Sequence, residues 1–431
     1  MKLPAVIFLM LIFSILAGTA HAGEPLPQEN LSALIETALI NNPELKSSEA
    51  RWRMFVNRAR QAGALEDPML MIKLQNLVTR DPLVFDKDPQ TAKVIGISQQ
   101  IPFFGKRAIR QEVAGHEAES YRWALEERRL ELGRMVKETY YQLYGVDRAL
   151  MVIAKNLGLL DDLKSIAETR YSVGQGTQQD ILKASLEKSR MFDMQISLQQ
   201  QRQSLAATLN SLLARPPATQ VGGIADFALP PLPLSAEQLT VTAQENRPQL
   251  KSLERLADKG KASRRLAEKE FYPDFTLSLE YMARQEAMDD PGYDMVNAGI
   301  TVNLPLQRER RQAMLDEASS ETRMAMEEMN ILRNGIALAV HDTLAQLSRR
   351  RKLVELYRDA IIPQAEQALE SALIGYRVGK VDFPAVLENR MTLFSYEREL
   401  YDSQTEYMVK LAQLEAVTGA GLPAEDHTRH H

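Results

Sequence analysis

The sequence predicts a mainly α-helical protein with a small β part, in which one structural unit occurs twice. Three observations carry this prediction. Motifs recur at a nearly constant offset, each half contains two short segments of alternating apolar and polar residues, and each half contains a helix of unusual length. The chain has 431 residues, of which 45% are hydrophobic and 25% charged, so it is long enough and apolar enough to fold.

The duplication is visible in matched motifs. The segment 43–47 (PELKS) returns as 248–252 (PQLKS), and Tyr171-Ser-Val-Gly174 returns as Tyr376-Arg-Val-Gly379. Chance can produce one such pair but not several in register, so we interpret the halves as copies of one unit. The same or nearly the same offset relates three further pairs: Pro68 with Pro273, Ile101 with Leu304, and Leu182 with Leu387.

The domain boundaries follow from this register and from composition. The segment between the copies is rich in Pro and Gly, as linkers are. We expect five parts: a signal peptide over 1–22, a first structural repeat over 23–215, a linker over 216–234, a second structural repeat over 235–418 and a polar C-terminal tail over 419–431.

The N-terminus has the parts of an export signal. Lys2 supplies positive charge, residues 5–17 form an apolar core, and Ala20 and Ala22 are small residues at the positions that a signal peptidase reads. The alternative is an uncleaved membrane anchor, which a 13-residue core is too short to provide. We therefore expect cleavage near Ala22 and export from the cytoplasm.

Each half contains two segments with the period of half-buried strands. Over 274–282, Phe, Leu, Leu and Tyr alternate with Thr, Ser and Glu, and the other segments alternate in a similar way. One face of each strand is therefore apolar and the other polar. The four predicted strands are 69–78 and 93–101 in the first half, and 274–283 and 295–304 in the second.

The helices are long, and apolar residues in the longest follow coiled-coil spacing. A helix over 104–172 would measure about 100 Å, about twice the length of a helix over 178–213. Two half-length helices can therefore pack beside one full-length helix. In addition, we predict uninterrupted helical stretches over 32–65 and 236–269, and a helix over 308–377 that Pro363 should kink.

A strand with one apolar and one polar face suits lipid on one side and water on the other. In lipid all backbone groups must be paired, so strands span a membrane only as a closed barrel, and single-chain barrels start at eight strands. Four strands per chain must then be pooled among subunits, and three chains give twelve. The alternative is an ordinary soluble sheet that is covered on one side.

Composition excludes several classes of function. The chain has no cysteine, which removes disulfides, thiolate metal sites, thiol nucleophiles and a Cys-linked lipid anchor. A net charge of -5 offers no basic surface for nucleic acid. Phosphate-binding, zinc-hydrolase and nucleophile-elbow motifs are not found, so we expect neither an enzyme nor a cofactor.

The duplicated turns, Tyr171/Gly174 and Tyr376/Gly379, together with the stretch Ile101-Pro-Phe-Phe-Gly-Lys-Arg107, resemble the TolC family of outer-membrane efflux proteins. The Pro-x-x-Gly-Lys-Arg element is similar to the heavy-metal branch of that family. The resemblance implies a homotrimer with a 12-stranded outer-membrane β-barrel and a periplasmic α-helical barrel, with the linker at its equator. An RND-type inner-membrane pump and a periplasmic adaptor (membrane fusion protein) would load it with metal cations or, alternatively, drugs. Relatives in the metal branch often carry a lipidated cysteine, which this chain lacks, so the barrel alone would hold it in outer-membrane lipid.

The resemblance also implies roles for particular residues. The turns and the helix starts that follow them would form the periplasmic tip that docks the adaptor: Tyr171, Gly174, Leu182, Tyr376, Gly379 and Leu387. Asp180 and Glu388 would form a constriction of the pore. The alternative is local, because glycine supplies a turn with positive φ and a carboxylate at a helix start favours the helix dipole.

Two rival classes stay open on sequence alone. A periplasmic adaptor would contain one helical hairpin instead of two. An elongated periplasmic coiled-coil scaffold would not need alternating strands at matched places in both halves. The C-terminal tail contains His427, His430 and His431 and is either a metal-binding tract or a polar terminus without structure.

Overall fold

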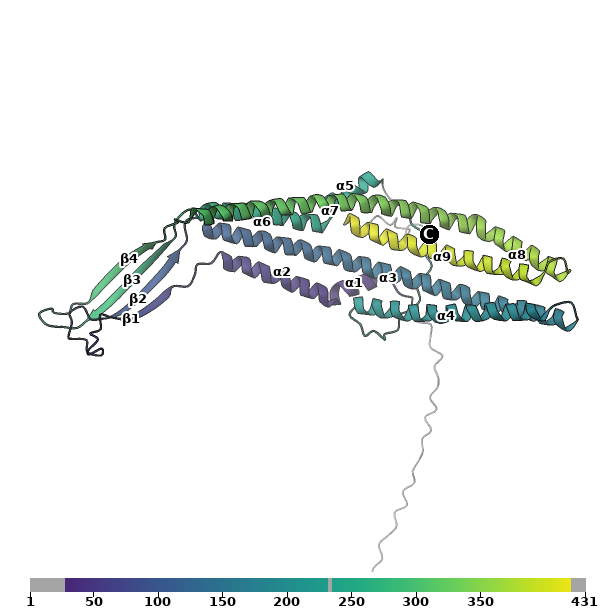
Figure 1. Ribbon diagram of the computed structural model, residues 1–431, viewed down its shortest axis with the longest axis horizontal. Helices are drawn as coiled ribbons and strands as arrows, with labels where there is room; N and C mark the ends of the chain where they lie inside the picture. The colour runs from purple at the N-terminus through teal and green to yellow at the C-terminus, as the bar shows by residue number, and fades with distance from the viewer. Residues whose placement is uncertain (1–27, 232–234, 420–431) are drawn as a thin grey trace, which may run out of the picture.

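The computed structural model describes residues 28–231 and 235–419. The predicted signal peptide, part of the linker and nearly all of the tail lie outside these residues. The molecule is elongated, with a four-stranded sheet at one end and two helical hairpins that end in turns at the other (Figure 1). We call these the sheet end and the turn end.

Nine α-helices account for most of the described chain, and both halves have the same order of elements. The first half contains α1 (Leu31–Asn41), α2 (Pro43–Ala62), α3 (Lys106–Ser172) and α4 (Gln178–Leu212). The second half contains α5 (Ala236–Asn246), α6 (Pro248–Lys269), α7 (Arg308–Leu356), α8 (Ile362–Arg377) and α9 (Phe383–Thr418).

The uninterrupted helices predicted over 32–65 and 236–269 are wrong, because each is broken into two. The breaks lie at Asn42 and Arg247, whose ψ angles are 124° and 116°. A proline follows each of these residues, and proline pushes the preceding residue out of the helical region. The Asn42 side chain also accepts hydrogen bonds from the backbone of Glu44 and Leu45, which caps the new helix.

Pro363 interrupts its helix through a π-helical turn that precedes the proline. Residues Tyr357–Ile361 form this turn between α7 and α8, and Ile362 N–H bonds to the carbonyl of Tyr357. Proline has no N–H and its ring displaces the carbonyl four residues earlier, so a wider turn accommodates it without ending the helix.

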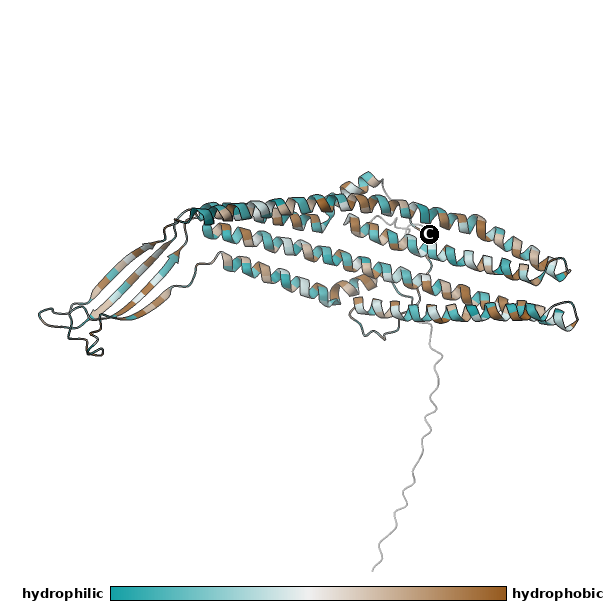
Figure 2. Ribbon diagram, viewed as in Figure 1, coloured by the Kyte–Doolittle hydropathy of each residue, from teal (hydrophilic) through white to brown (hydrophobic). Residues whose placement is uncertain are grey.

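The sheet joins the two halves. Strands β1 (Met69–Gln75), β2 (Ala92–Ile101), β3 (Phe275–Arg284) and β4 (Met295–Val302) pair antiparallel in the order β1-β2-β3-β4, so β2 and β3 form the contact between halves. The strands alternate hydrophobic and hydrophilic residues along their length (Figure 2). β1 ends three residues before its predicted end, because Asn76 adopts a φ of 52°.

The long helix α3 organises the helical part. It has 67 residues, which corresponds to about 100 Å. Towards the sheet end α3 packs against α2 and α6, and towards the turn end it packs against α4 and α9 (Figure 1). Two shorter helices thus lie beside a full-length one, as the helix lengths predicted. The core near the turn end gathers Ile153, Leu160, Met191, Phe383 and Val386.

Candidate functional site

The two faces of the sheet differ in chemistry. The register places Ile72, Ile95, Tyr281 and Val296 in one row across the four strands, on the face that we call the apolar face. The next row lies on the opposite, polar face and contains Met71, Gly96, Glu280 and Asn297.

The apolar face is uncovered in the described chain. Ile72 is 76% exposed and Ile300 is 69% exposed. A soluble protein rarely exposes a continuous apolar surface of this kind, so the face requires lipid or a partner. The sheet also has two free edges, because neither β1 nor β4 has a second partner among the described strands.

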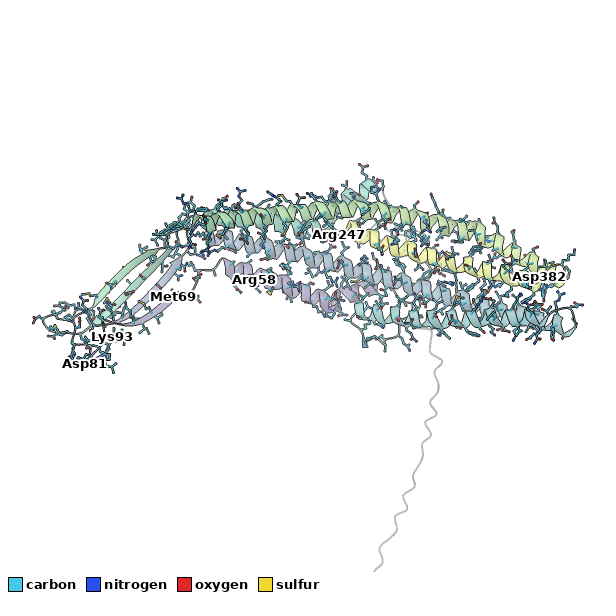
Figure 3. The ribbon with its side chains drawn as sticks, in the orientation of Figure 1. Arg58, Met69, Asp81, Lys93, Arg247 and Asp382 are labelled. Carbon is cyan, nitrogen blue, oxygen red and sulfur yellow. The ribbon has the colours of Figure 1, made fainter. Side chains whose placement is uncertain are left out.

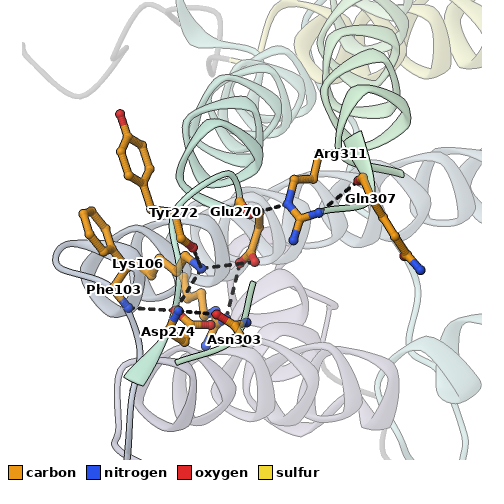
Figure 4. A network of polar contacts seen from close by, with 9 residues as sticks. Phe103, Lys106, Glu270, Tyr272, Asp274, Asn303, Gln307 and Arg311 are labelled. Atoms are coloured by element: carbon orange, nitrogen blue, oxygen red, sulfur yellow. Dashed lines mark hydrogen bonds and ion pairs between the residues drawn. The ribbon is translucent and has the colours of Figure 1, made fainter. Parts of the chain in front are cut away.

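A buried lysine joins the sheet to the helices (Figure 4). Lys106 is 1% exposed, and its Nζ lies 2.9 Å from Asp274 Oδ1, 3.3 Å from Glu270 Oε2 and 3.1 Å from the carbonyl of Tyr272. Phe103 N–H also donates to Asp274 Oδ1, at 2.7 Å. The ion pairs connect the start of α3 in the first half to the segment before β3 in the second.

Several residues of the stretch Ile101–Arg107 have structural roles in the connection from β2 to α3. Gly105 has a φ of 86°, which lets the chain turn from β2 into α3. The Phe103 ring stacks on Tyr272 at 4.6 Å, and Arg107 donates two hydrogen bonds to the carbonyl of Gly63. Sequence reasoning identified this stretch but missed its partners Glu270 and Asp274, because no repeat or spacing relates them to it.

At the turn end both hairpins reverse in the same way. Gly174 and Gly379 have φ angles of 75° and 73°, so the expectation of positive φ at both glycines is confirmed. In each turn the residue after the glycine bonds back to the carbonyl five residues earlier, at 2.8 Å in both cases. This arrangement is the Schellman motif, which satisfies the last carbonyls of a helix.

The two turns nevertheless present different surfaces. Tyr171 is 49% exposed and Leu182 is 62% exposed, whereas their counterparts Tyr376 and Leu387 are 4% and 7% exposed. Burial raises the pKa of the Tyr376 hydroxyl above its ordinary value, and the charge of Asp180 adds to this effect. The first turn therefore exposes its Tyr and the Leu that follows, whereas the second buries both counterparts.

Arg170 connects the two turns. Its guanidinium lies over the Tyr376 ring at 4.5 Å and donates a hydrogen bond to the carbonyl of Tyr376. The position that corresponds to Arg170 in the second half is Gly375, so this contact has no copy. Sequence reasoning missed Arg170, although its place beside the Tyr-x-x-Gly motif was a usable signal.

The two predicted constriction residues have different local roles. Asp180 lies in the first turn of α4, where its Oδ2 accepts a hydrogen bond from Thr177 N–H at 3.1 Å. Glu388 is exposed and lies further along α9, whose N-terminus is capped by Asp382 instead. Asp382 is at the turn end (Figure 3). Among the described residues no group of three His, Cys, Asp or Glu side chains could hold a metal ion.

Comparison with known proteins decides the family. The model of the family "Outer membrane efflux protein" matches residues 34–215 and again residues 239–420. The chain belongs to this family. Its members are transport channels and not enzymes, so this chain is an outer-membrane efflux channel, and the adaptor and scaffold alternatives are excluded. Among the described residues no helix is long and apolar enough to cross a membrane.

The individual relatives share little sequence identity with this chain. The cobalt-zinc-cadmium resistance protein CzcC of Cupriavidus metallidurans is 27% identical over 67% of this chain and 68% of its own length. The pyoverdine export outer membrane protein OpmQ of Pseudomonas putida is 24% identical over 95% of this chain and 92% of its own. The crystal structure of the outer membrane protein VceC of Vibrio cholerae superposes with a TM-score of 0.76 at 20% identity, over 91% of this chain and 97% of VceC.

Proposed function

We propose that three copies of this chain form one exit channel, with a 12-stranded barrel in the outer membrane and a helical tunnel in the periplasm. The observation that carries the proposal is the sheet, which has an exposed apolar face and two free edges. In lipid both edges must be paired, and closure of four-stranded sheets into one barrel achieves this without a further element.

The helices support the same arrangement. α4 and α8 lie at opposite edges of the helical layer at the turn end, since α3 contacts α4 and α9 contacts α8. Both edges expose apolar residues, and packing α4 of one copy against α8 of the next would cover them. These residues are Leu182, Leu186 and Ile196 on α4, and Ile374 on α8.

We expect the protein to fractionate with the outer membrane as a heat-sensitive trimer. Two adjacent residues on β2 provide a matched test, because Ile97 lies on the apolar face and Ser98 on the polar face. Ile97→Arg should cost about 2–4 kcal/mol near the middle of the bilayer and reduce the trimer, whereas Ser98→Arg should be tolerated. The measurement is the amount of trimer on gels of unheated outer membranes. A water-soluble monomer after signal removal would contradict the proposal.

The cargo and partners of the channel are a separate part of the proposal. We propose that a periplasmic adaptor and an inner-membrane pump of the RND type deliver metal cations to the channel. The name of CzcC, a cobalt-zinc-cadmium resistance protein, and the Pro-x-x-Gly-Lys-Arg element support metal cations. Small organic molecules are the second candidate cargo, because OpmQ, named for pyoverdine export, covers more of this chain.

The turn end is the proposed docking site for the adaptor. Tyr171 and Leu182 are the predicted residues whose side chains can touch a partner directly, because both side chains are exposed. The buried Tyr376 and Leu387 would act by holding the second turn in place. Gly174 and Gly379 set the shape of both turns.

Asp180 and Glu388 are proposed to narrow the pore at the turn end by gathering six carboxylates around the three-fold axis. Asp180→Asn with Glu388→Gln removes these charges but keeps an oxygen that can accept the Thr177 hydrogen bond. We expect higher single-channel conductance and block by hexaamminecobalt(III) that is weaker by about tenfold, which corresponds to 1.4 kcal/mol. Asp81→Asn with Asp88→Asn is the control, because Asp81 lies at the sheet end (Figure 3). Equal block in both variants would assign Asp180 and Glu388 a local role only.

A further inference from the structure

The strands contain four methionines, and all four lie on the polar face. Met69 and Met71 belong to β1, Met282 to β3 and Met295 to β4. In the register, Met69 lies in the row of Ser98 on β2, and Met71 lies in the row of Gly96. Met282 and Met295 both lie in the row of Val94. No methionine of the strands lies on the apolar face.

This segregation is unusual because the other large apolar residues of the strands avoid the polar face. Apart from Val94, the remaining Leu, Ile, Val, Phe and Tyr side chains of the strands occupy the apolar face. A face that needed only apolar filling would use the same residues as the lipid side. What methionine adds is a polarisable sulfur, which is a weak hydrogen-bond acceptor and a ligand for soft metal ions.

The methionines occupy three successive rows of the polar face. Met69 lies at the helix end of the sheet and Lys93 at its far end (Figure 3). From Met69 the next row outwards contains Met71, and the one after it contains Met282 directly opposite Met295. Rows on one face are separated by two residues, or about 7 Å. The sulfurs therefore follow the strand direction, along which cargo would move through a barrel.

The sulfur atoms of Met282 and Met295 have polar neighbours. Met282 is paired in register with Met295, and such cross-strand neighbours have Cβ atoms about 4.5–5.5 Å apart. Met282 Sδ accepts a hydrogen bond from Asn297 Nδ2 at 2.9 Å, and Met295 Sδ lies 3.9 Å from Arg284 Nη1. Arg284 is itself paired with Asp290 at 2.6 Å, which offsets its positive charge.

Gly96 makes room for the second row. A Cβ atom at this position would lie 3.2 Å from Met71 Cε and 3.0 Å from Glu280 Cγ. The Met71 methyl group and the Glu280 side chain thus meet above the glycine. The side chains of Met71 on β1 and Glu280 on β3 are thus brought together from two strands that are not neighbours.

We propose that the methionines of the polar face bind soft monovalent cations, Cu(I) or Ag(I), during their passage through the barrel. This inference rests on the proposed function, because the polar face must be the inner face of the channel. Thioethers bind such ions in preference to harder divalent ions. Conduction requires sites that bind weakly enough to release the ion, and neutral sulfurs meet this requirement. Met69 and Met295 are 65% and 45% exposed, whereas Met282 is 8% exposed and packs against Ala92 and Val94.

Silver is the probe of choice, because Ag(I) is stable in air and the chain has no cysteine to compete with methionine. The full-length protein, labelled with ¹³C at the methionine methyl groups, is titrated with silver nitrate in chloride-free detergent solution. The test variant replaces Met69, Met71, Met282 and Met295 with Leu. The matched control replaces four exposed methionines on helices with Leu: Met54, Met151, Met324 and Met326.

We expect Ag(I) to shift the strand methyl signals in the wild type and in the control, and the strand variant to bind Ag(I) at least about tenfold more weakly. Micromolar Ag(I) should also reduce single-channel conductance in the control but not in the strand variant. Equal affinity and equal block in both variants would overturn the proposal. Conductance before silver is added tests the channel itself, so a failure of the proposed function is distinguished from a failure of the methionine site. If the fourfold variant does not fold, the pairs M69L/M71L and M282L/M295L give the same comparison.

Discussion

Replacing Lys106 with Met should destabilise the protein by about 3 kcal/mol or more. Lys106 is buried, and its ammonium is held by two carboxylates and a backbone carbonyl. Without it, Asp274 keeps the hydrogen bond from Phe103 but loses the ammonium that pairs with it, and only the more distant charge of Arg110 remains. The Asp274 side chain is only 13% exposed, and a carboxylate that is mostly shielded from water is costly once its partner is removed.

Lys164→Met on the same helix is the matched control. Lys164 pairs with Glu168 at 3.5 Å, but the two side chains are 38% and 52% exposed, so its loss should cost only about 0–0.5 kcal/mol. The measurement is the temperature at which the trimer dissociates on gels. Adding Asp274→Leu to Lys106→Met should recover part of the loss, because the lone charge is then removed. A dissociation temperature for Lys106→Met equal to that of Lys164→Met would show that the network does not hold the sheet to the helices.

The double variant Gly174→Val/Gly379→Val is expected to abolish efflux-dependent resistance while the trimer still assembles. Both glycines have positive φ, which a β-branched residue adopts at a cost of about 1–2 kcal/mol. No atom lies within 4 Å of a Cβ built at Gly174, so the cost arises from the backbone and not from a clash. That amount is too small to unfold the channel but large enough to distort both turns. Cross-linking to the adaptor should fall together with resistance.

Gly158→Val provides the control for this prediction. Gly158 lies inside α3 with helical φ, and a Cβ there also meets no atom within 4 Å. Resistance should therefore persist in Gly158→Val. If resistance and cross-linking also persist in the double variant, the turns are not the docking site and the adaptor binds along the flank of the helices.

Much of the fold was predictable because it depends on local patterns that recur. Alternation identified all four strands to within a few residues, and the long proline-free run over 104–172 identified α3. The breaks at Asn42 and Arg247 were also encoded, since each precedes the proline of the repeated motif. They were missed because the helical period continues across them.

The features that sequence did not reveal depend on contacts between the halves. The partners of Lys106 lie more than 160 residues away, and nothing in their spacing marks them. The difference in exposure between Tyr171 and Tyr376 also depends on a contact between the halves. Both belong to identical turns, yet only the second is covered, by Arg170 from the other half. A repeated motif predicts repeated backbone geometry, but burial depends on what packs against each copy.

The most direct test of the central claim is single-channel recording from the purified trimer in a planar bilayer. Three copies that close one barrel should give discrete conductance steps of a single size, and Ile97→Arg should lower the frequency of insertion while Ser98→Arg does not. A protein that folds with the same helical content but stays monomeric in water and produces no steps would contradict the account.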